Sequence, residues 1–190
     1  MLNILASHYQ IMGRTALSTA IVLIGLVLGI ITAINAMGSV GLMPIAAAPL
    51  WSEWQLGPND SMLVYSLGHF LGEGQLPPPK STHYFVRSAD EDGNSLRTDC
   101  IYVVEGKLSP ARWWTMSVAL PGTAAPHSEL TAGEAVLAQD GVLKMTISAH
   151  PMPGNWIVPP DGNSISLYFI VNEPTPGQHM LLPTVTKSGC

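Results

Sequence analysis

The stretch that decides the fold reads ARWWTMSVAL and covers residues 111–120. In its second half, every other position holds an apolar side chain: Trp114, Met116, Val118 and Leu120. Because successive side chains of a β-strand point to opposite faces, this period of two predicts a strand over 112–120 with one buried face. Trp113 then lies on the opposite face, where it either contacts a partner or packs against a helix.

Alternation of the same kind recurs on both sides of this stretch. It predicts further strands at residues 83–87, 96–105, 142–149 and 164–171, and a short apolar strand at 135–138. Turn sequences fit between them, namely DEDGNS at 90–95 and the hairpin dipeptide Asp140-Gly141. Short strands at hairpin distances predict a mainly β domain, an antiparallel β-sandwich or jelly-roll-like fold.

One short helix is expected before these strands. The sequence Asn-Asp-Ser at 59–61 is typical of a helix N-cap. Apolar residues then follow at three- and four-residue spacing: Met62, Leu63, Leu67, Phe70 and Leu71. This spacing predicts a helix that ends near residues 72–74 and buries its apolar side. Of the two tryptophans just upstream, we expect Trp54 in the core and Trp51 at a membrane interface.

The N-terminal part of the chain carries a long hydrophobic signal. Residues 15–52 have no formal charge, and the 21 residues at 16–36 are rich in Leu, Ile, Val and Ala. At about 1.5 Å per residue, a helix of this length spans about 30 Å, the thickness of a bilayer core. We therefore expect a retained transmembrane helix over 15–37. The alternative is a cleaved signal peptide, whose apolar region is usually shorter.

Two details of this segment bear on its topology and packing. Arg14 is the last charged residue before the hydrophobic run, and the next basic residue is Lys80. The positive-inside rule then places residues 1–14 in the cytoplasm and the rest of the chain outside. Gly25 and Gly29 have the G-x-x-x-G spacing that lets two helices approach closely, although glycine is also common in such helices without any packing role.

These signals divide the chain into four parts. We expect a cytoplasmic N-terminus at 1–14, the transmembrane helix at 15–37, a linker at 38–58 and a periplasmic β-domain at 59–190. Only 11% of residues are charged, and the formal net charge is −5. All 13 acidic residues lie beyond residue 50, whereas the basic residue Arg14 lies before it. An acidic domain is a poor ligand for phosphate backbones, so we expect no nucleic-acid partner.

The chain has two cysteines, Cys100 and Cys190. In an oxidising compartment they would form a disulfide that ties the proline-containing tail at 173–189 to a strand. The alternative is a pair of free thiols. Neither cysteine has histidines or cysteines nearby at ligand spacing, so no metal site is expected there.

Several short motifs resemble the domain-of-unknown-function family 1214. These motifs are PARWW at 110–114, Asp140-Gly141, PGNW at 153–156 and Leu167-Tyr168. The resemblance covers residues 60–190 and is closest to short members with one N-terminal span, one strand cysteine and one C-terminal cysteine. It implies a β-rich extracytoplasmic domain of a bacterial envelope and implies no reaction. Trp113 in place of the usual Phe, and Ile157-Val158 in place of Leu-Pro, keep the apolar bulk.

Asn155 and Trp156 form the candidate ligand-binding site. Trp156 could stack on a flat ligand such as a sugar while Asn155 hydrogen-bonds it, and Trp113 could add a contact surface. The structural alternative is that Asn155 caps a turn and Trp156 closes one end of the sandwich. The chain has no G-x-S-x-G motif, no nucleotide-binding glycine motif and no histidine pair at ligand spacing. We therefore expect no catalytic residues, no cofactor and no metal.

Together these observations favour a non-catalytic protein of the bacterial inner membrane. Its periplasmic β-domain would act as an accessory or docking subunit of a larger membrane-protein assembly. The partners would be the lipid bilayer and other subunits, contacted through the transmembrane helix and the β-domain. The alternative function is a periplasmic ligand-binding or envelope-processing domain with a pocket near the Asn155-Trp156 turn.

Overall fold

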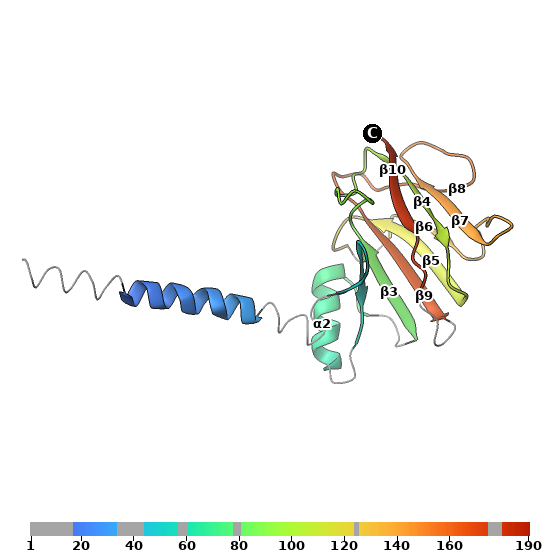
Figure 1. Ribbon diagram of the computed structural model, residues 1–190. Coiled ribbons are helices and arrows are strands. Elements are labelled where there is room, and N and C mark those ends of the chain that lie inside the picture. Colours follow the sequence, from blue (N-terminus) through green and yellow to red (C-terminus); the bar gives the residue numbers. More distant parts are fainter. Residues whose placement is uncertain (1–16, 34–43, 57–60, 78–80, 124–125, 175–179) are drawn as a thin grey trace, which may run out of the picture. The chain divides into compact units, whose positions relative to one another are not determined.

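The computed structural model describes residues 17–33, 44–56, 61–77, 81–123, 126–174 and 180–190. The chain divides into two units, Met1–Ser39 and Val40–Cys190. The described part of the first unit is a helix over residues 17–33, and the second unit carries the strands and the helix α2 (Figure 1).

The strands of the second unit form two sheets. The six-stranded sheet contains, in spatial order, β1 (Ile45–Ala48), β2 (Trp51–Trp54), β3 (Thr82–Arg87), β9 (Ser166–Pro174), β5 (Ala111–Ala119) and β6 (Ser128–Thr131). The four-stranded sheet contains β10 (Thr184–Gly189), β4 (Ile101–Lys107), β7 (Val142–Ile147) and β8 (Asn155–Ile157). All neighbouring strands are antiparallel except β7 and β8, which are parallel.

Strand β9 lies at the centre of the six-stranded sheet. It pairs with β3 on one side and with β5 on the other, so that Phe169 stands opposite both Phe85 and Met116. In the four-stranded sheet, β10 pairs with β4 and places Val185 opposite Val104. Both sheets are therefore completed by pairings between segments that are far apart in the sequence.

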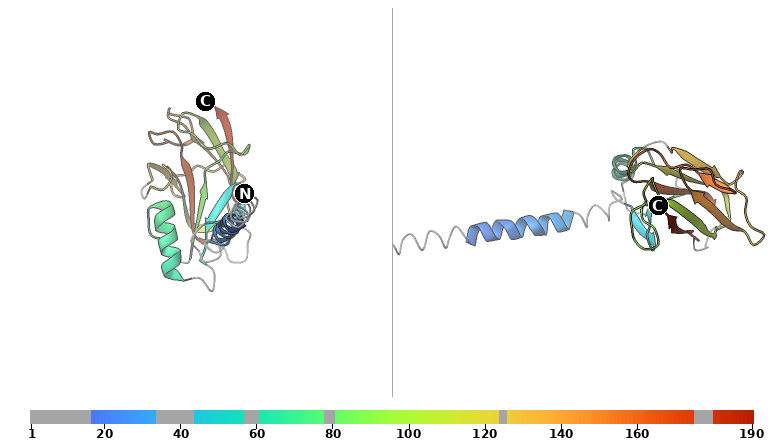
Figure 2. Two further views of the ribbon diagram at one scale, coloured as in Figure 1. Left: turned by 90° about the vertical axis from the view of Figure 1, so that its left-hand side faces the viewer. Right: turned by 90° about the horizontal axis from the view of Figure 1, so that it is seen from above.

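The main hydrophobic core lies between the two sheets. It contains buried side chains from both of them, among them Phe85, Met116 and Phe169 from the six-stranded sheet and Val104, Met145 and Val185 from the four-stranded sheet. The turned views of Figure 2 show the two sheets packed against each other. Because each strand alternates, one face of each sheet supplies this core and the other face is left for solvent or for α2.

The predicted mainly β class with antiparallel sheets is confirmed. Strands β3, β4, β5, β7 and β9 overlap the segments predicted from alternation, although β4 begins at Ile101 rather than at residue 96. Trp114, Met116 and Val118 are buried on one face of β5. The Asp140-Gly141 turn is also present, with Gly141 at φ 78°. The segment predicted as a strand at 135–138 forms only one bridge, between Leu137 and Leu143.

The predicted linker at 38–58 needs a correction. Residues 45–54 form β1 and β2, and β2 pairs with β3, so this segment is part of the six-stranded sheet. The compact unit begins at Val40, before the predicted boundary at 59. Trp51, which we placed at a membrane interface, is buried in the main core, and its indole N–H donates a hydrogen bond to the Pro183 carbonyl at 2.9 Å. Trp54 is buried, as predicted.

The hydrophobic N-terminal segment is helical over residues 17–33. A membrane-spanning helix needs about 20 apolar residues. Within the described residues, no helix has both the length and the apolar character to cross a bilayer. The transmembrane helix predicted for 15–37 is therefore not supported, and residues 15–16 and 34–37 lie outside the described part of the chain.

Helix α2 (Met62–Glu73) forms close to its predicted place but with the opposite side buried. Its N-cap is Ser61, and Gly74 ends it in the left-handed conformation, at φ 72°. The buried side is formed by Tyr65, Gly68, His69 and Glu73. The predicted buried residues are instead exposed: Met62, Leu63, Leu67, Phe70 and Leu71. The spacing correctly indicated a one-sided helix, but tertiary packing selected its polar and aromatic side.

Candidate functional site

A second, smaller core joins α2 to the outer face of the six-stranded sheet. It is an aromatic cluster of Trp54, Tyr65, Tyr84 and Tyr168, with Ala119 beside them. His69 of α2 packs into it, with ring centroids 4.9 Å from Trp54 and 4.8 Å from Tyr84. The helix comes so close that a Cβ atom on Gly72 would stand 2.8 Å from the Trp54 ring. Glycine at this position therefore allows the close contact.

Glu73 is the charged residue of this cluster. It is the last residue of α2, and it is only 6% exposed. Its Oε1 accepts a hydrogen bond from the Trp54 indole N–H at 2.8 Å. The salt bridges of the described residues pair five other carboxylates with basic side chains. Glu73 is thus a buried carboxylate without a basic partner among those residues, which is a costly arrangement in a folded protein.

Tyr168 of β9 lies next to this carboxylate. It is 4% exposed, and its hydroxyl is buried without a hydrogen-bond partner among the described residues. Burial raises the pKa of Tyr168, and the negative charge of Glu73 adds to the rise. The same two causes raise the pKa of Tyr84. Both phenols therefore keep their protons at physiological pH and are available as hydrogen-bond donors.

His69 is completely buried in the same cluster. Its Nδ1 is 2.9 Å from the Gln75 carbonyl, and its Nε2 has no partner among the described residues. Burial lowers the pKa of His69, so the ring is neutral at pH 7. With a neutral imidazole the tautomer that donates from Nδ1 satisfies the carbonyl, and Nε2 is left as an acceptor.

A cavity of about 500 Å³ opens between the C-terminal end of α2, the β1–β2 hairpin and the start of β9. Its polar lining includes Glu73 and Tyr168 together with the hydroxyls of Ser52, Ser88 and Ser166. The Oγ atoms of Ser88 and Ser166 are 2.9 Å apart. Its apolar rim includes Pro44, Leu50 and Val86. Apolar walls with a few convergent polar groups are typical of small-molecule sites.

The opposite side of α2 is an apolar surface. Leu63 is 78% exposed and Leu71 is 71% exposed, and Met62, Leu67 and Phe70 are each about half exposed. We call these five residues the outer face of α2. Glu73, which points inward, is the one charged residue in the helix sequence. An ordinary surface helix carries charged or polar residues on its solvent side, so this face has the composition of a contact surface.

The structure places the sequence-predicted site residues in two different sheets. Asn155 and Trp156 are neighbours in β8, and Trp113 lies in β5 of the other sheet, where it pairs with Asn172. Asn155 Oδ1 accepts from the Val136 N–H at 2.8 Å, and its amide group donates to the carbonyls of Val136 and Lys144. Both amide hydrogens of Asn155 are thereby bonded within the fold, as expected if this residue has a structural role rather than a ligand-binding role.

The two predicted tryptophan contacts differ from each other. Trp156 donates its indole N–H to the Ser148 carbonyl at 2.8 Å and is half-buried. Trp113 is 41% exposed and is not part of the aromatic cluster, whose members come from α2 and from β2, β3, β5 and β9. A ligand-binding role for these three residues stays a prediction, and the cavity described above is lined by other residues.

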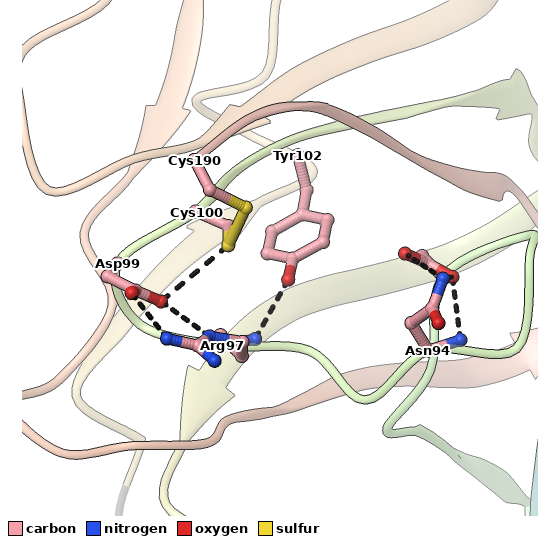
Figure 3. Close-up of a disulfide and its surroundings, with 7 residues drawn as sticks. Asn94, Arg97, Asp99, Cys100, Tyr102 and Cys190 are labelled. Carbon is pink, nitrogen blue, oxygen red and sulfur yellow. Dashed lines mark hydrogen bonds and ion pairs between the residues drawn. A yellow bond between two sulfur atoms is a disulfide. The ribbon is translucent and has the colours of Figure 1, made fainter.

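Cys100 and Cys190 form a disulfide, as predicted for an oxidising compartment (Figure 3). It joins the residue before β4 to the residue after β10. Tyr102 lies beside it, and its hydroxyl accepts a hydrogen bond from the Arg97 N–H at 2.8 Å. Gly25 and Gly29 lie in the helix over 17–33 with open space around their Cα atoms. Their role in helix packing stays a prediction.

Comparison with known families decides the identification. A family model described as "Protein of unknown function (DUF1214)" matches residues 81–176. The chain belongs to this family. The matched residues of this DUF1214 protein run from β3 to the end of β9, so Tyr168 lies within the match, whereas α2 and Glu73 precede it. No curated protein matches the chain.

Two solved structures resemble the DUF1214 protein at 16% sequence identity. The VPA0106 protein from Vibrio parahaemolyticus matches with a TM-score of 0.53, over 70% of this chain and 38% of that chain. An uncharacterized protein from Burkholderia cenocepacia matches with a TM-score of 0.47, over 58% of this chain and 30% of that chain. The chain therefore spans only 30–38% of the length of these proteins, and the likeness to the Vibrio protein supports the fold alone.

Sequence reasoning missed the residues around the cavity. Glu73 and Tyr168 are 95 positions apart, and no short motif of this DUF1214 sequence connects them. One signal was available, because Glu73 is the only charged residue in the predicted helix after Asp60. Among the described residues, no three His, Cys, Asp or Glu side chains gather in a group that could hold a metal ion.

Proposed function

We propose that this protein is a non-catalytic accessory subunit of a larger membrane-protein assembly. Its N-terminal segment over 15–37 would anchor it in the bacterial inner membrane, and its β-domain would dock onto other subunits on the periplasmic side. The observation that carries the proposal is the outer face of α2, where five large apolar side chains stand exposed.

The outer face of α2 is unsuited to permanent contact with water. Exposing a leucine side chain that could be buried forgoes about 1.5–3 kcal/mol. Isolated exposed leucines are ordinary, but this face concentrates five apolar residues on three turns of helix without an exposed charge. Its surface suits an apolar helix or apolar sheet face of another protein, into which Leu63, Leu67 and Phe70 would insert as a ridge.

The described start of the domain lies beside α2. Pro44 lines the cavity that Gly72 and Glu73 also line, so this segment enters the domain beside the C-terminal end of α2.

Charge and redox chemistry support the assigned topology. Arg14 precedes the uncharged stretch and the next basic residue is Lys80, so the positive-inside rule favours a cytoplasmic N-terminus. A disulfide persists in the periplasm and is reduced in the cytosol. Gly25 and Gly29 would supply a second contact, between the anchor and a neighbouring helix in the bilayer.

Site-specific photo-cross-linking tests the docking role. A benzoylphenylalanine at Leu63, Leu67 or Leu71 in the full chain should give an adduct with one recurring membrane protein. The control position is Val136, which is apolar and 72% exposed but lies away from α2, between β6 and β7. Introducing Leu67→Glu should abolish the adduct formed from position 63.

Two outcomes would contradict the proposal. The first is an absence of adducts from all three α2 positions while the protein purifies alone in mild detergent. The second is an equal yield of the same adducts from Val136. The anchor is tested separately. The full chain should stay with the membranes during carbonate extraction, and deletion of residues 15–37 should release it.

A further inference from the structure

The cavity beside Glu73 has an electrostatic imbalance that the docking role does not explain. Glu73 carries the only carboxylate among the residues that line the cavity, and none of those residues is Lys, Arg or His. The carboxylate is more than nine-tenths buried and accepts one described hydrogen bond, from the neutral indole of Trp54. An ionised carboxylate can accept about four hydrogen bonds, so most of its capacity is unused by the described residues.

The second unused group is the hydroxyl of Tyr168. Tyr168 lines the same cavity, and its hydroxyl is buried without a well-formed hydrogen bond among the described residues. Its polar neighbours are the side chains of Glu73 and Ser166 and the backbone of Gly122. Leaving a buried hydroxyl unsatisfied costs about 1–3 kcal/mol, so native proteins seldom retain one without a reason. A phenylalanine would fill the same space without that cost. The tyrosine is therefore best explained by something that enters the cavity.

The remaining lining defines the size and chemistry of that occupant. The hydroxyls of Ser88 and Ser166 form a polar patch near Tyr168, and Pro44, Leu50 and Val86 supply apolar walls. The volume of about 500 Å³ suits a small molecule or one long side chain. A primary ammonium group has three donors and one positive charge, which matches one carboxylate and two hydroxyl acceptors. The alkyl chain of such a ligand would lie along the apolar rim.

We propose that this cavity binds a primary ammonium group, with the Glu73 carboxylate as its counter-ion and the Tyr168 hydroxyl as its second hydrogen-bond partner. The ammonium group could belong to a free alkylamine or to a lysine side chain of a docked protein. Both sources present the same chemistry to the cavity, and the experiment below separates them. The site lies on the inner side of α2 and does not depend on the outer face.

The indole N–H of Trp54 is a direct reporter of this site because it donates to Glu73. We would label the tryptophans of the full chain with ¹⁵N in detergent micelles and titrate with cadaverine (1,5-diaminopentane). The Trp54 indole resonance should shift and saturate. The Trp51 indole donates to the Pro183 carbonyl in the other core and serves as an internal control that should not move. The neutral analogue 1,5-pentanediol should leave both resonances unchanged.

Three variants make the test specific. Glu73→Gln should weaken cadaverine binding about tenfold or more, because the charge-assisted bond is lost. Tyr168→Phe should weaken it about threefold to tenfold while leaving the thermal unfolding midpoint unchanged or higher, because the unsatisfied hydroxyl is removed. Glu105→Gln removes a carboxylate from the four-stranded sheet and should bind like the wild type. If Glu73→Gln does not fold, Tyr168→Phe alone decides the matter.

A capped lysine, N-acetyl-lysine-N-methylamide, separates the two sources. Tighter binding of the capped lysine than of cadaverine would assign the cavity to a lysine side chain of a partner, and weaker binding would assign it to a free amine. The proposal is overturned if cadaverine and pentanediol shift the Trp54 resonance equally, if neither shifts it, or if Tyr168→Phe binds cadaverine as the wild type does.

Discussion

Asn155 shows at the scale of one residue how a single side chain holds three segments together. From β8 it binds the N–H and the carbonyl of Val136 in the preceding loop and the carbonyl of Lys144 in β7. The sequence marked Asn155 as important because of its place before a tryptophan, but the sequence alone could not separate a structural role from a ligand role. That distinction depends on where residues 136 and 144 lie in space.

Replacing Asn155 tests this structural role. We expect Asn155→Ala to lower the free energy of unfolding by about 2–4 kcal/mol, because three backbone groups lose the hydrogen-bond partner that a nearly buried side chain gives them. Trp156→Phe, which removes the bond to the Ser148 carbonyl and part of a half-buried ring, should cost about 1 kcal/mol. Urea unfolding followed by circular dichroism measures both values. A smaller loss for Asn155→Ala than for Trp156→Phe would contradict this account.

His83 and Glu53 form a titratable pair on neighbouring strands β3 and β2. His83 Nδ1 is 2.5 Å from Glu53 Oε1, and this hydrogen bond raises the pKa of His83 above its ordinary value of 6.5. A raised histidine pKa means that the folded protein binds the proton more tightly than the unfolded chain. The stabilisation is therefore complete below pH 6.5 and is lost as the pH rises through the raised pKa.

This pair predicts a pH-dependent effect of mutation. His83→Gln should lower the free energy of unfolding at pH 5.5 more than at pH 9, by less than about 1 kcal/mol because the imidazole is about one-third exposed. Glu53→Gln should show the same pH pattern, and the double variant should lose no more than the larger single effect. Guanidinium melts at the two pH values measure the difference. A greater loss at pH 9 would refute the assignment.

At the scale of secondary-structure elements, α2 shows what local patterns can and cannot predict. Its spacing predicts a one-sided helix and its approximate ends, because those depend on neighbours along the chain. Which side is buried depends on the sheet it meets. The sheet offers the aromatic residues Trp54, Tyr84 and Tyr168, and these pack with Tyr65 and His69 rather than with the leucines.

The reversed orientation of α2 can be tested by stability measurements. Leu63→Gln and Leu71→Gln should change the free energy of unfolding by no more than about 0.5 kcal/mol, because both side chains are exposed. Tyr65→Ala should cost about 3 kcal/mol, because it empties a place in the aromatic cluster. Thermal unfolding of the three variants gives the comparison. A large loss from either leucine variant would mean that the helix packs with its apolar side inward.

Two of the strands that were missed, β1 and β2, share a physical reason. Strand β1 reads IAAA and β2 reads WSEW, and neither has a run of alternating β-branched residues. They become strands because β3 offers a free edge to β2, and β2 in turn offers one to β1, a condition that no local window contains. The longer strands β5, β7 and β9 were predictable because their alternation records a buried face directly.

At the scale of the whole molecule, the disulfide joins residues 90 positions apart. By the loop-entropy estimate, closing such a loop contributes up to about 4–5 kcal/mol to stability. We expect Cys190→Ser to lower the free energy of unfolding by about 2–4 kcal/mol, because β10 keeps its pairing with β4. Denaturant melts with and without reductant measure this. Reductant should lower the stability of the wild type and leave that of Cys190→Ser unchanged. If reductant affects the two proteins equally, the disulfide does not form in the protein.

The central place of β9 also governs when the domain can fold. Strands β3 and β5 are both neighbours of β9 but not of each other, and β10 is needed beside β4. While a ribosome is still making the residues before 166, the six-stranded sheet lacks its middle strand. The six-stranded sheet can therefore be completed only after most of the polypeptide has been made. Late synthesis of this strand makes completion of the larger sheet one of the last steps in folding.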